Sequence, residues 1–540
     1  MATSTTRSTL VRTLRVALQR ACWLLACGMS LLATSSCSVI VNAEEREACT
    51  STTECTERFG EPSACVNSEC KKLLTAECTE VWPAGALSKD NVMLIGFVGA
   101  LTGDFASYGT PTKEGAELAL HEIEGRSGGL GPPTDSNIGQ RHLAMLVCDH
   151  GTDPVGVARH LIENANVPVI IGDSFSTPTL DIFANAAKPA GVLVLSPSAT
   201  SPALTDFPDN GLLWRTSPSD VVQAETLKFL LVDVVDALHE TGVLAPGKAA
   251  KIAMPNKDDS AGGGLAKAAT SLNQDSPTPA PVVKPDLADQ YPDPDKHPVN
   301  WQEHIDNITN ASPNIILAMG TGEFVSDMMQ GIEDNWNLAR PRPWYLLPEG
   351  DRVTELKVLV AEAKNLRTSL NDRILGTAPG ARRSSLYDSF AASFQALFKN
   401  RDPGNLAEFG YDAGYLVAYA IAIANKASPS GRELATALQH VSCKEEGGTT
   451  VSVGPAMFSR YFGIAANGGC IDFEGASGPL DFNPDTGEAL SDIATWCMRP
   501  NGDGTFGFEP PLTGFYSVKE GRMKDDNPPD LTQRGWCAQQ

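Results

Sequence analysis

The sequence has 540 residues, of which 42% are hydrophobic and 20% charged, so it is long enough for more than one globular unit with its own hydrophobic core. Its formal net charge at pH 7 is −23. A phosphate backbone or an anionic membrane surface repels a chain with this excess of acidic residues, which argues against nucleic-acid binding.

Residues 1–36 have the pattern of an export signal. Arginines without any acidic residue precede an apolar run at 21–33, which is shorter than the roughly 20 residues that cross a bilayer. The run leads into Ala-Thr-Ser-Ser-Cys at 33–37, which resembles the lipobox of bacterial lipoproteins, with Thr34 in place of the usual leucine. We expect cleavage before Cys37 and lipidation of that cysteine, which anchors the chain in the cell envelope, on the periplasmic side or at the cell surface. Secretion without a lipid is the alternative.

The cysteines that follow predict disulfides. Their even number in an exported chain allows up to five bonds, although the sequence does not give their pairing. Four of them lie between residues 49 and 70, where large apolar residues are too few for a core, so we expect a small crosslinked module within residues 37–80. A zinc site is the alternative, but this stretch has no C-x2-C pair and no histidine. The candidate disulfide cysteines are Cys49, Cys55, Cys65, Cys70, Cys78, Cys148, Cys443, Cys470, Cys497 and Cys537.

From residue 91 onward, short apolar runs alternate with helical patterns. This alternation predicts βαβ units and parallel sheets, which we interpret as two doubly wound α/β lobes. A segment rich in proline and aspartate at 274–298 interrupts the pattern and is expected to be a surface insertion. The expected strands are 93–99, 142–147, 167–171, 191–195, 251–254, 314–319 and 344–347, and the expected helices are 153–164, 177–187, 264–272, 324–333, 384–400, 411–425 and 431–440.

Gly172-Asp173-Ser174, directly after the third of these strands, raises a catalytic alternative. Lipases and esterases of the GDS type carry a nucleophilic serine in such a place and need an Asp-x-x-His near the C-terminus. The only such spacing joins Asp236 to His239, in mid-chain and inside a helical pattern. The chain also has no H-E-x-x-H motif and no phosphate-binding loop. We therefore expect no enzyme activity, no metal and no cofactor.

Six phrases follow one another along the chain: IGFVGALTGDFASYG, GAELALHEI, SPSATSPALT, WRTSPSD, LLPEG and IDFEGASGPLDFNPDTGEA. Their order and spacing carry a resemblance to the Leu/Ile/Val-type (type I) periplasmic binding proteins of ABC transporters. It extends from about residue 91 to residue 498 of the 540. The resemblance implies a hinged cleft between two lobes that are joined by three crossovers. The first lobe would contain 91–217 and 373–442, and the second 218–372 and 443–540, including a C-terminal extension.

The resemblance also implies a carboxylate site on the first lobe. In the family, the equivalents of Ser176, Ser198 and Thr200 bind the α-carboxylate of an amino acid. Ser176 and Thr177 stand at an expected helix start, and Ser198, Ala199 and Thr200 follow the next strand. Hydroxyls and free N–H groups at the carboxyl ends of parallel strands bind such a group without a cationic side chain.

On the second lobe, Glu349 matches the acid that pairs with the α-ammonium in the family. Tyr108 matches an aromatic residue of the cleft, and Ala261 stands where family members often have another aromatic. The sequence thus predicts an extracytoplasmic solute-binding lipoprotein that captures an amino acid or a similar small polar ligand for an ABC permease. A ligand sensor or interaction lipoprotein of the same fold is the alternative.

Overall fold

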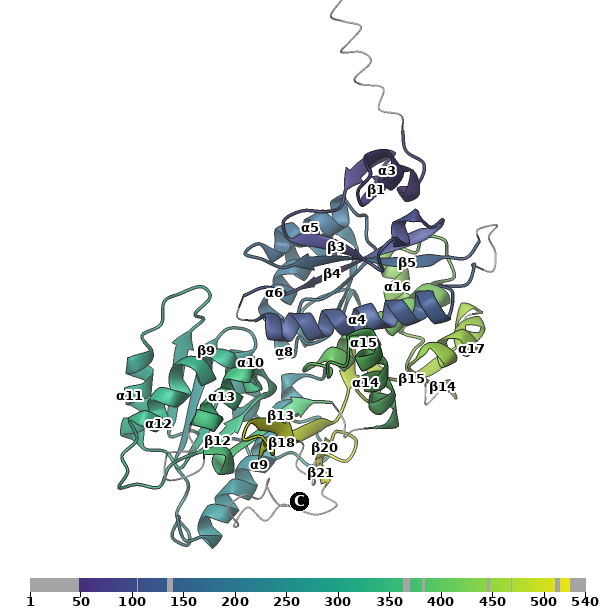
Figure 1. Ribbon diagram of the computed structural model, residues 1–540. Coiled ribbons are helices and arrows are strands. Elements are labelled where there is room, and N and C mark those ends of the chain that lie inside the picture. Colours follow the sequence, from purple (N-terminus) through teal and green to yellow (C-terminus); the bar gives the residue numbers. More distant parts are fainter. Residues whose placement is uncertain are drawn as a thin grey trace, which may run out of the picture.

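The computed structural model describes residues 48–524 except 104, 134–138, 363–369, 381–383, 444–446, 468 and 510–514. Two α/β lobes and a small N-terminal module make up this part of the chain (Figure 1). The predicted signal, Cys37 and Cys537 lie outside the described residues. Within the described residues, no helix combines the length and apolar character that crossing a membrane requires.

The first lobe is built on an eight-stranded sheet with the order β16-β17-β8-β7-β6-β4-β5-β3. Its inner strands β4 to β8 run parallel, whereas β3 pairs antiparallel with β5 at one edge. The strands predicted in this lobe are therefore confirmed. The sheet consists of β3 (Cys78–Trp82), β4 (Val92–Gly99), β5 (His142–Asp149), β6 (Val169–Ile171), β7 (Leu193–Ser196), β8 (Leu213–Arg215), β16 (Asp481–Asn483) and β17 (Glu488–Leu490), and the predicted strands among them are β4, β5, β6 and β7.

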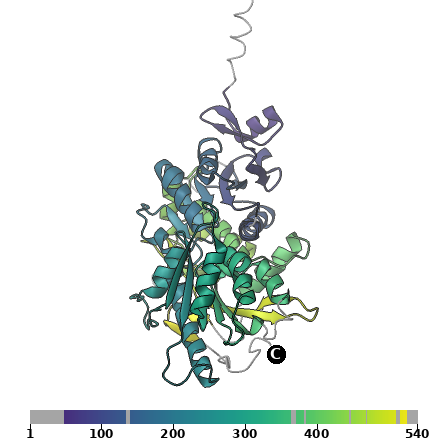
Figure 2. The same cartoon turned by 90° about the vertical axis from the view of Figure 1, so that its left-hand side faces the viewer.

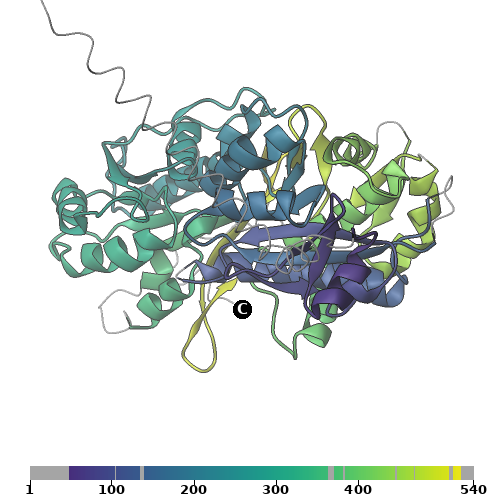
Figure 3. The same ribbon diagram turned by 90° about the horizontal axis from the view of Figure 1, so that it is seen from above.

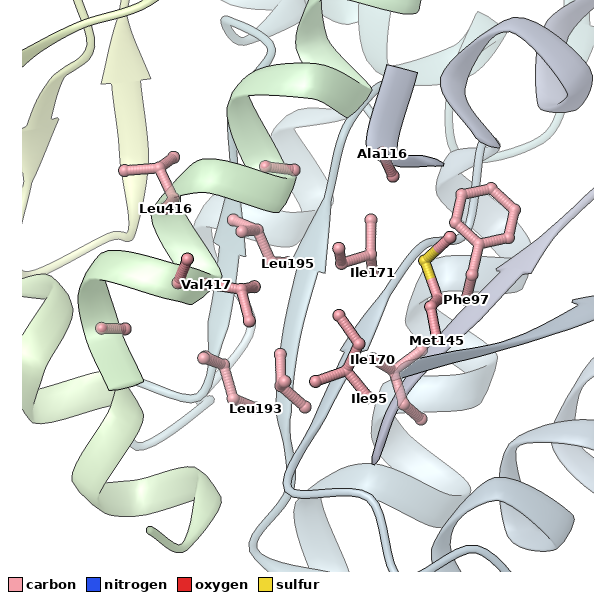
Figure 4. Close-up of a cluster of buried hydrophobic side chains, with 14 of the residues drawn as sticks. Ile95, Phe97, Ala116, Met145, Ile170, Ile171, Leu193, Leu195, Leu416 and Val417 are labelled. Atoms are coloured by element: carbon pink, nitrogen blue, oxygen red, sulfur yellow. The ribbon is translucent and has the colours of Figure 1, made fainter. Parts of the chain in front are cut away.

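The core of the first lobe explains why its strands are continuous apolar runs. Ile95, Ile170 and Leu193 lie on neighbouring strands and are fully buried, with helices packed above them (Figure 4). Strands covered on both faces carry apolar residues without alternation. The helices α4 (Ala106–Arg126) and α15 (Ala407–Ala424) lie side by side against this sheet (Figure 1). They can approach closely because Gly115 has no side chain: a Cβ atom there would lie 1.9 Å from the carbonyl oxygen of Ala407.

The second lobe repeats this plan on a sheet with the order β10-β9-β11-β12-β13-β18-β20-β21, and β19 pairs with β18. Two separate apolar clusters cover its two faces, one below α11, α12 and α13 and one below α9 and α10. The strands are β9 (Ile252–Asp258), β10 (Leu287–Pro292), β11 (Ile315–Leu317), β12 (Trp344–Leu347), β13 (Ile374–Pro379), β18 (Ile493–Pro500), β19 (Phe506–Glu509), β20 (Phe515–Ser517) and β21 (Arg522–Lys524), and the helices are α9 (Asp220–Glu240), α10 (Gly262–Thr270), α11 (Trp301–Ala311), α12 (Gln330–Asp334) and α13 (Thr354–Glu362).

The segment 274–298, expected to be a surface insertion, contains the edge strand β10. Its residues alternate between buried and exposed positions, and it pairs parallel with β9. An edge strand tolerates polar residues and a terminal proline because one side of its backbone faces no neighbour. The sequence did not predict this strand because the segment is rich in proline and aspartate.

The boundaries between the lobes differ from those that the resemblance implied. β13, placed in the first lobe by the prediction, pairs parallel with β12 in the second sheet. Residues 443–490, assigned to the second lobe, belong to the first. Their helix α17 (Pro455–Ala466) sets Phe458 against Tyr415 and Tyr419 of α15, and β16 and β17 extend the first sheet. The crossovers follow β8, β13 and β17 because strand pairing, which no single segment reveals, decides which sheet each strand joins.

Two disulfides hold the small module, and a third joins β3, the strand that follows the module, to β5 of the first lobe. The module consists of α3 (Thr52–Phe59) and the hairpin β1 (Ser63–Val66) and β2 (Glu69–Lys72), and it lies at the end of the molecule away from the second lobe (Figures 1, 2 and 3). Since its cysteines pair with one another, the zinc alternative is wrong. The disulfides are Cys49–Cys65, Cys55–Cys70, Cys78–Cys148 and Cys443–Cys470, and Cys497 is disulfide-bonded as well.

Candidate functional site

A cavity of about 50 Å³ lies between the lobes, at the carboxyl ends of strands from both sheets. That volume holds roughly three to five water molecules at 10–15 Å³ each, so the lobes are closed tightly on each other. Parallel sheets bring their loops together at this end, which is why residues far apart in sequence meet here. The lining residues are Tyr108, Ser174, Phe175, Ser176, Ser198, Thr200 and Leu406 from the first lobe, together with Asp220, Gln223, Ala261, Gly262, Leu265, Gly320, Thr321, Pro348, Glu349 and Gly350 from the second lobe.

Three predicted hydroxyls reach the cavity, and their hydrogen bonds differ. Ser176 Oγ accepts a bond from the backbone N–H of Ser201 at 3.1 Å, so that bond does not use the hydroxyl proton. Ser198 Oγ donates its proton to the carbonyl oxygen of Ser174 at 2.9 Å. Thr200 accepts a bond from the backbone N–H of Asp220 at its carbonyl oxygen, and its side chain lowers the pKa of Asp220 against the larger effect of burial. Ser176 is therefore the best placed of the three to donate to an anionic ligand group.

Thr177 and Ala199, also predicted to bind the ligand, do not line the cavity. Successive residues of a helix point about 100° apart, so Ser176 and Thr177 cannot both face it. Thr177 Oγ1 instead lies 2.8 Å from Ser260 Oγ of the second lobe. The backbone N–H of Ala199 donates to Ser196 Oγ, and its carbonyl oxygen accepts from Ser217 Oγ. The sequence predicted ligand contacts for Thr177 and Ala199, whereas the fold places both residues outside the cavity lining.

Glu349 projects from the loop after β12 and is 8% exposed. It accepts a hydrogen bond from the side-chain amide of Asn405, which belongs to the first lobe. Burial raises the pKa of Glu349 to about 7, although the guanidinium of Arg352 opposes the shift. The carboxyl group is thus poised between its neutral and ionised forms near neutral pH.

Asp220 is a second acid of the cavity, which the sequence did not single out. It begins α9, is 2% exposed, and its Oδ2 atom has no hydrogen-bond partner among the described residues. Burial raises its pKa to about 7. With its amide turned to satisfy both neighbours, Gln223 donates to Asp220 Oδ1 at 3.2 Å and accepts from the N–H of Glu349 at 3.1 Å. Gln223 therefore holds the two acids in one network.

The described residues that line the cavity include these two acids and no lysine, arginine or histidine. The cations whose charges act on the two acids are already engaged. Arg352, which acts on Glu349, donates to the side-chain oxygen of Asn405 at 2.8 Å, and Arg215, which acts on Asp220, pairs with Glu488. The cavity therefore favours a positively charged ligand group and disfavours a ligand that is only an anion.

Tyr108 closes the cleft rather than leaving it open. Its hydroxyl donates to the carbonyl oxygen of Gly350 in the second lobe, and its ring packs edge-on against Phe175. Burial raises the pKa of Tyr108 well above its ordinary value, and the charges of Glu349 and Asp351 raise it further. The phenol is therefore a neutral donor that joins the lobes.

The geometry around Ser174 does not form a hydrolase site. Its Oγ lies 3.4 Å from the hydroxyl of Thr112, whereas the nearby His150 bonds through Nδ1 to Asp173 at 2.8 Å. Asp236, which had the spacing of a catalytic acid, is exposed on α9. A nucleophile needs a base within hydrogen-bond reach, and the residues proposed for that role do not approach Ser174.

Two α/β lobes that close on a cavity at the ends of their strands define a hinged two-lobe binding protein. The chain belongs to the periplasmic binding protein family, whose model matches residues 93–465. The family and the fold predicted from the sequence are therefore confirmed.

Two curated relatives match shorter stretches. The Leu/Ile/Val-binding protein of Citrobacter freundii is 31% identical over 156 residues, which are 28% of this chain and 38% of the relative. The Leu/Ile/Val-binding protein of Escherichia coli (strain K12) is 30% identical over 176 residues, 31% of this chain and 43% of the relative. The chain thus spans about two fifths of the length of the curated relatives that it matches.

Solved structures share the fold over a longer stretch. The branched-chain amino acid transporter substrate binding protein LivJ from Streptococcus pneumoniae, in complex with isoleucine, is 19% identical, has a TM-score of 0.52, and covers 78% of this chain and 100% of its own. A solute binding protein of an ABC transporter from Rhodopseudomonas palustris BisB5, in complex with 3,4-dihydroxy benzoic acid, is 14% identical with a TM-score of 0.53, and covers 81% and 99%. At these identities the likeness concerns the fold alone.

Proposed function

We propose that the protein is an extracytoplasmic solute-binding protein, not an enzyme, that captures an amino acid or a similar small polar ligand between its lobes for an ABC permease. The observation that carries this proposal is the pair of buried acids, Asp220 and Glu349, in a cavity that no cationic side chain of the described residues lines. The names of the curated relatives, which are Leu/Ile/Val-binding proteins, support an amino acid. In this proposal Cys37 carries the lipid anchor.

The α-ammonium of the ligand would bind between the two acids. Asp220 Oδ2 is buried without a partner among the described residues, and the bond that Glu349 accepts from Asn405 uses only part of the capacity of its carboxylate. An ammonium group placed there donates to both carboxylates and stabilises their ionised forms. A hydrogen bond to a charged group is worth roughly 1.5–3 kcal/mol, so this subsite would supply a large share of the affinity.

The α-carboxylate would bind at the hydroxyls of the first lobe. Ser176 has a proton that its bond from Ser201 does not use, and it would be the principal donor. Ser198 would have to release the carbonyl oxygen of Ser174 before donating its proton to the ligand, so its contribution would be smaller. The carboxylate and the ammonium would then lie against opposite walls of the cavity, as suits a zwitterion.

An aromatic acid is a second candidate, because one structural neighbour was solved with 3,4-dihydroxy benzoic acid and another with benzoate. The two acids of the cavity argue against it here. An anion without an ammonium group would meet Asp220 and Glu349 with no compensating charge from the lining. The candidates therefore differ in the charge that the ligand brings to the same cavity.

Calorimetry separates the two candidates. Leucine, isoleucine and valine are titrated into the full exported chain at pH 7.5, with benzoate as the matched carboxylate that lacks an ammonium group. The proposal predicts heat of binding, and a higher melting temperature, for at least one amino acid and for none of the aromatic acids. Binding of benzoate without binding of any amino acid would contradict it.

A further inference from the structure

The lobes touch directly along one side of the cavity. Ser260, in the loop after β9, meets two residues of the first lobe: its hydroxyl lies 2.8 Å from that of Thr177, and its carbonyl oxygen accepts a bond from Ser201 Oγ. A few residues further on, Gly264 of α10 faces Pro202, the first residue of the short helix α8 (Pro202–Thr205). We call these five residues the seam.

Gly264 must be glycine for this contact to form. A Cβ atom at Gly264 would lie 2.9 Å from Pro202 Cδ and 3.1 Å from Ser201 Oγ, both in the opposite lobe. Contacts this short force the lobes apart, since well-packed carbon atoms approach to about 3.5–4.0 Å. The preceding residue, Gly263, would have no atom within 4 Å of its Cβ. The requirement for glycine is therefore set by lobe closure and not by α10 itself.

The seam is linked to the cavity through one residue. Ser201 is fully buried; its hydroxyl donates to Ser260 across the seam, while its backbone N–H donates to Ser176 Oγ at 3.1 Å. Ser176 lines the cavity, whereas Thr177, Ser260 and Gly264 do not. The seam therefore forms when the lobes close and lies next to the ligand without contacting it.

We propose that the seam is a closure latch: its hydroxyl contacts and the missing side chain at Gly264 set the fraction of molecules with closed lobes, and so the affinity for the ligand. Its effect on affinity rests on the proposed function, whereas its effect on closure does not. If the ligand binds the closed form, the apparent dissociation constant is the intrinsic constant divided by the closed fraction. Residues that never touch the ligand then adjust its binding.

The test compares two neighbouring glycines of one helix in the full exported chain. Gly264→Val inserts a side chain into the seam, and Gly263→Val inserts the same side chain into open space with the same change in helix propensity. The radius of gyration is measured by small-angle X-ray scattering without ligand, and leucine binding by calorimetry. Gly264→Val should enlarge the radius of gyration and weaken leucine binding about tenfold or more. Gly263→Val should match the wild type in both.

An unchanged radius of gyration in Gly264→Val overturns the latch, whatever leucine does. If Gly264→Val is larger but leucine does not bind even to the wild type, the latch stands and the proposed amino-acid function fails. Should circular dichroism show that Gly264→Val is unfolded, Ser260→Ala and Thr177→Ala decide the question, because they remove the hydroxyl contact without adding atoms. A larger radius of gyration in both supports the latch, and wild-type values in both overturn it.

Discussion

The cavity has a wall of hydroxyls on the first lobe and a wall of acids on the second lobe, and the two differ in the free energy that their burial costs. The first lobe offers hydroxyls, which bury cheaply because each makes a hydrogen bond within the lobe. The second lobe offers Glu349, and the nearby Asp351 belongs to the same loop. Asp351 is fully buried, and neither of its carboxylate oxygens has a hydrogen-bond partner among the described residues. Burial, followed by the charges of Glu323 and Glu349, raises the pKa of Asp351 well above its ordinary value. The neutral wall is compatible with stability, whereas the acidic wall opposes it.

From this difference we expect the acidic wall to contribute more of the binding free energy than the hydroxyl wall does. A group that destabilises the unliganded protein is retained when it serves binding, a common conflict between stability and function. An ammonium group between Glu349 and Asp220 would offset the cost of burying both acids. Variants of the acidic wall should therefore change affinity and stability in opposite directions, and variants of the hydroxyl wall should change affinity with little effect on stability.

The largest effect is expected for Glu349→Gln. It should weaken leucine binding about 100-fold, because removing one partner of a buried charge pair costs roughly 2–5 kcal/mol. Calorimetry measures the loss. Glu355→Gln is the matched control, since Glu355 is an exposed acid on α13 of the same lobe. Equal leucine affinities of the two variants would contradict the assignment of Glu349 to the ammonium.

The same substitution should stabilise the unliganded protein at pH 8. The pKa of Glu349 is raised from 4.5 to about 7 in the folded state, so ionising it there opposes folding by on the order of 3 kcal/mol. This cost is absent below about pH 4.5, where the carboxyl is protonated in both states, and is complete above about pH 7. Urea unfolding of the wild type and Glu349→Gln should therefore diverge as the pH rises through this window. If the unfolding free energies of the two proteins keep a constant difference across this pH range, burial does not destabilise the ionised form of Glu349.

A smaller effect is expected on the hydroxyl wall. Ser176→Ala should weaken leucine binding about tenfold, because the hydroxyl donates to a charged group, while its unfolding free energy changes by less than that of Glu349→Gln. Ser198→Ala is the internal control, since its proton is already used by the carbonyl oxygen of Ser174. A larger loss for Ser198→Ala than for Ser176→Ala would reverse the order of the two hydroxyls.

The sequence predicted the fold well because its signals are local. Continuous apolar runs such as β4 and β6 mark strands buried on both faces, and the helices between them mark parallel connections. The lobe boundaries were predicted less well. The run that forms β13 has the same local character whether it joins the first sheet or the second, and only its pairing with β12 decides the matter.

The candidate site was predicted in part for the same reason. Ser176, Ser198, Thr200, Tyr108 and Glu349 meet at one cavity, as the resemblance to the Leu/Ile/Val-type binding proteins implied. Asp220 was missed because an acid at the start of a helix is ordinary there, where it complements the helix dipole. Only its burial and its link through Gln223 to Glu349 distinguish it.

In our proposal the two buried acids bind the ligand's ammonium group, and the number of protons released on ligand binding tests this assignment directly. At pH 6.5 Asp220 and Glu349, each with a pKa raised to about 7, are partly protonated in the unliganded protein. Leucine binding should ionise them and release protons, which calorimetry detects as a difference in apparent heat between two buffers of unlike ionisation enthalpy at the same pH. Proton release that disappears at pH 9 is the predicted result. At pH 6.5, leucine binding with no proton release, or with proton uptake, would contradict this assignment.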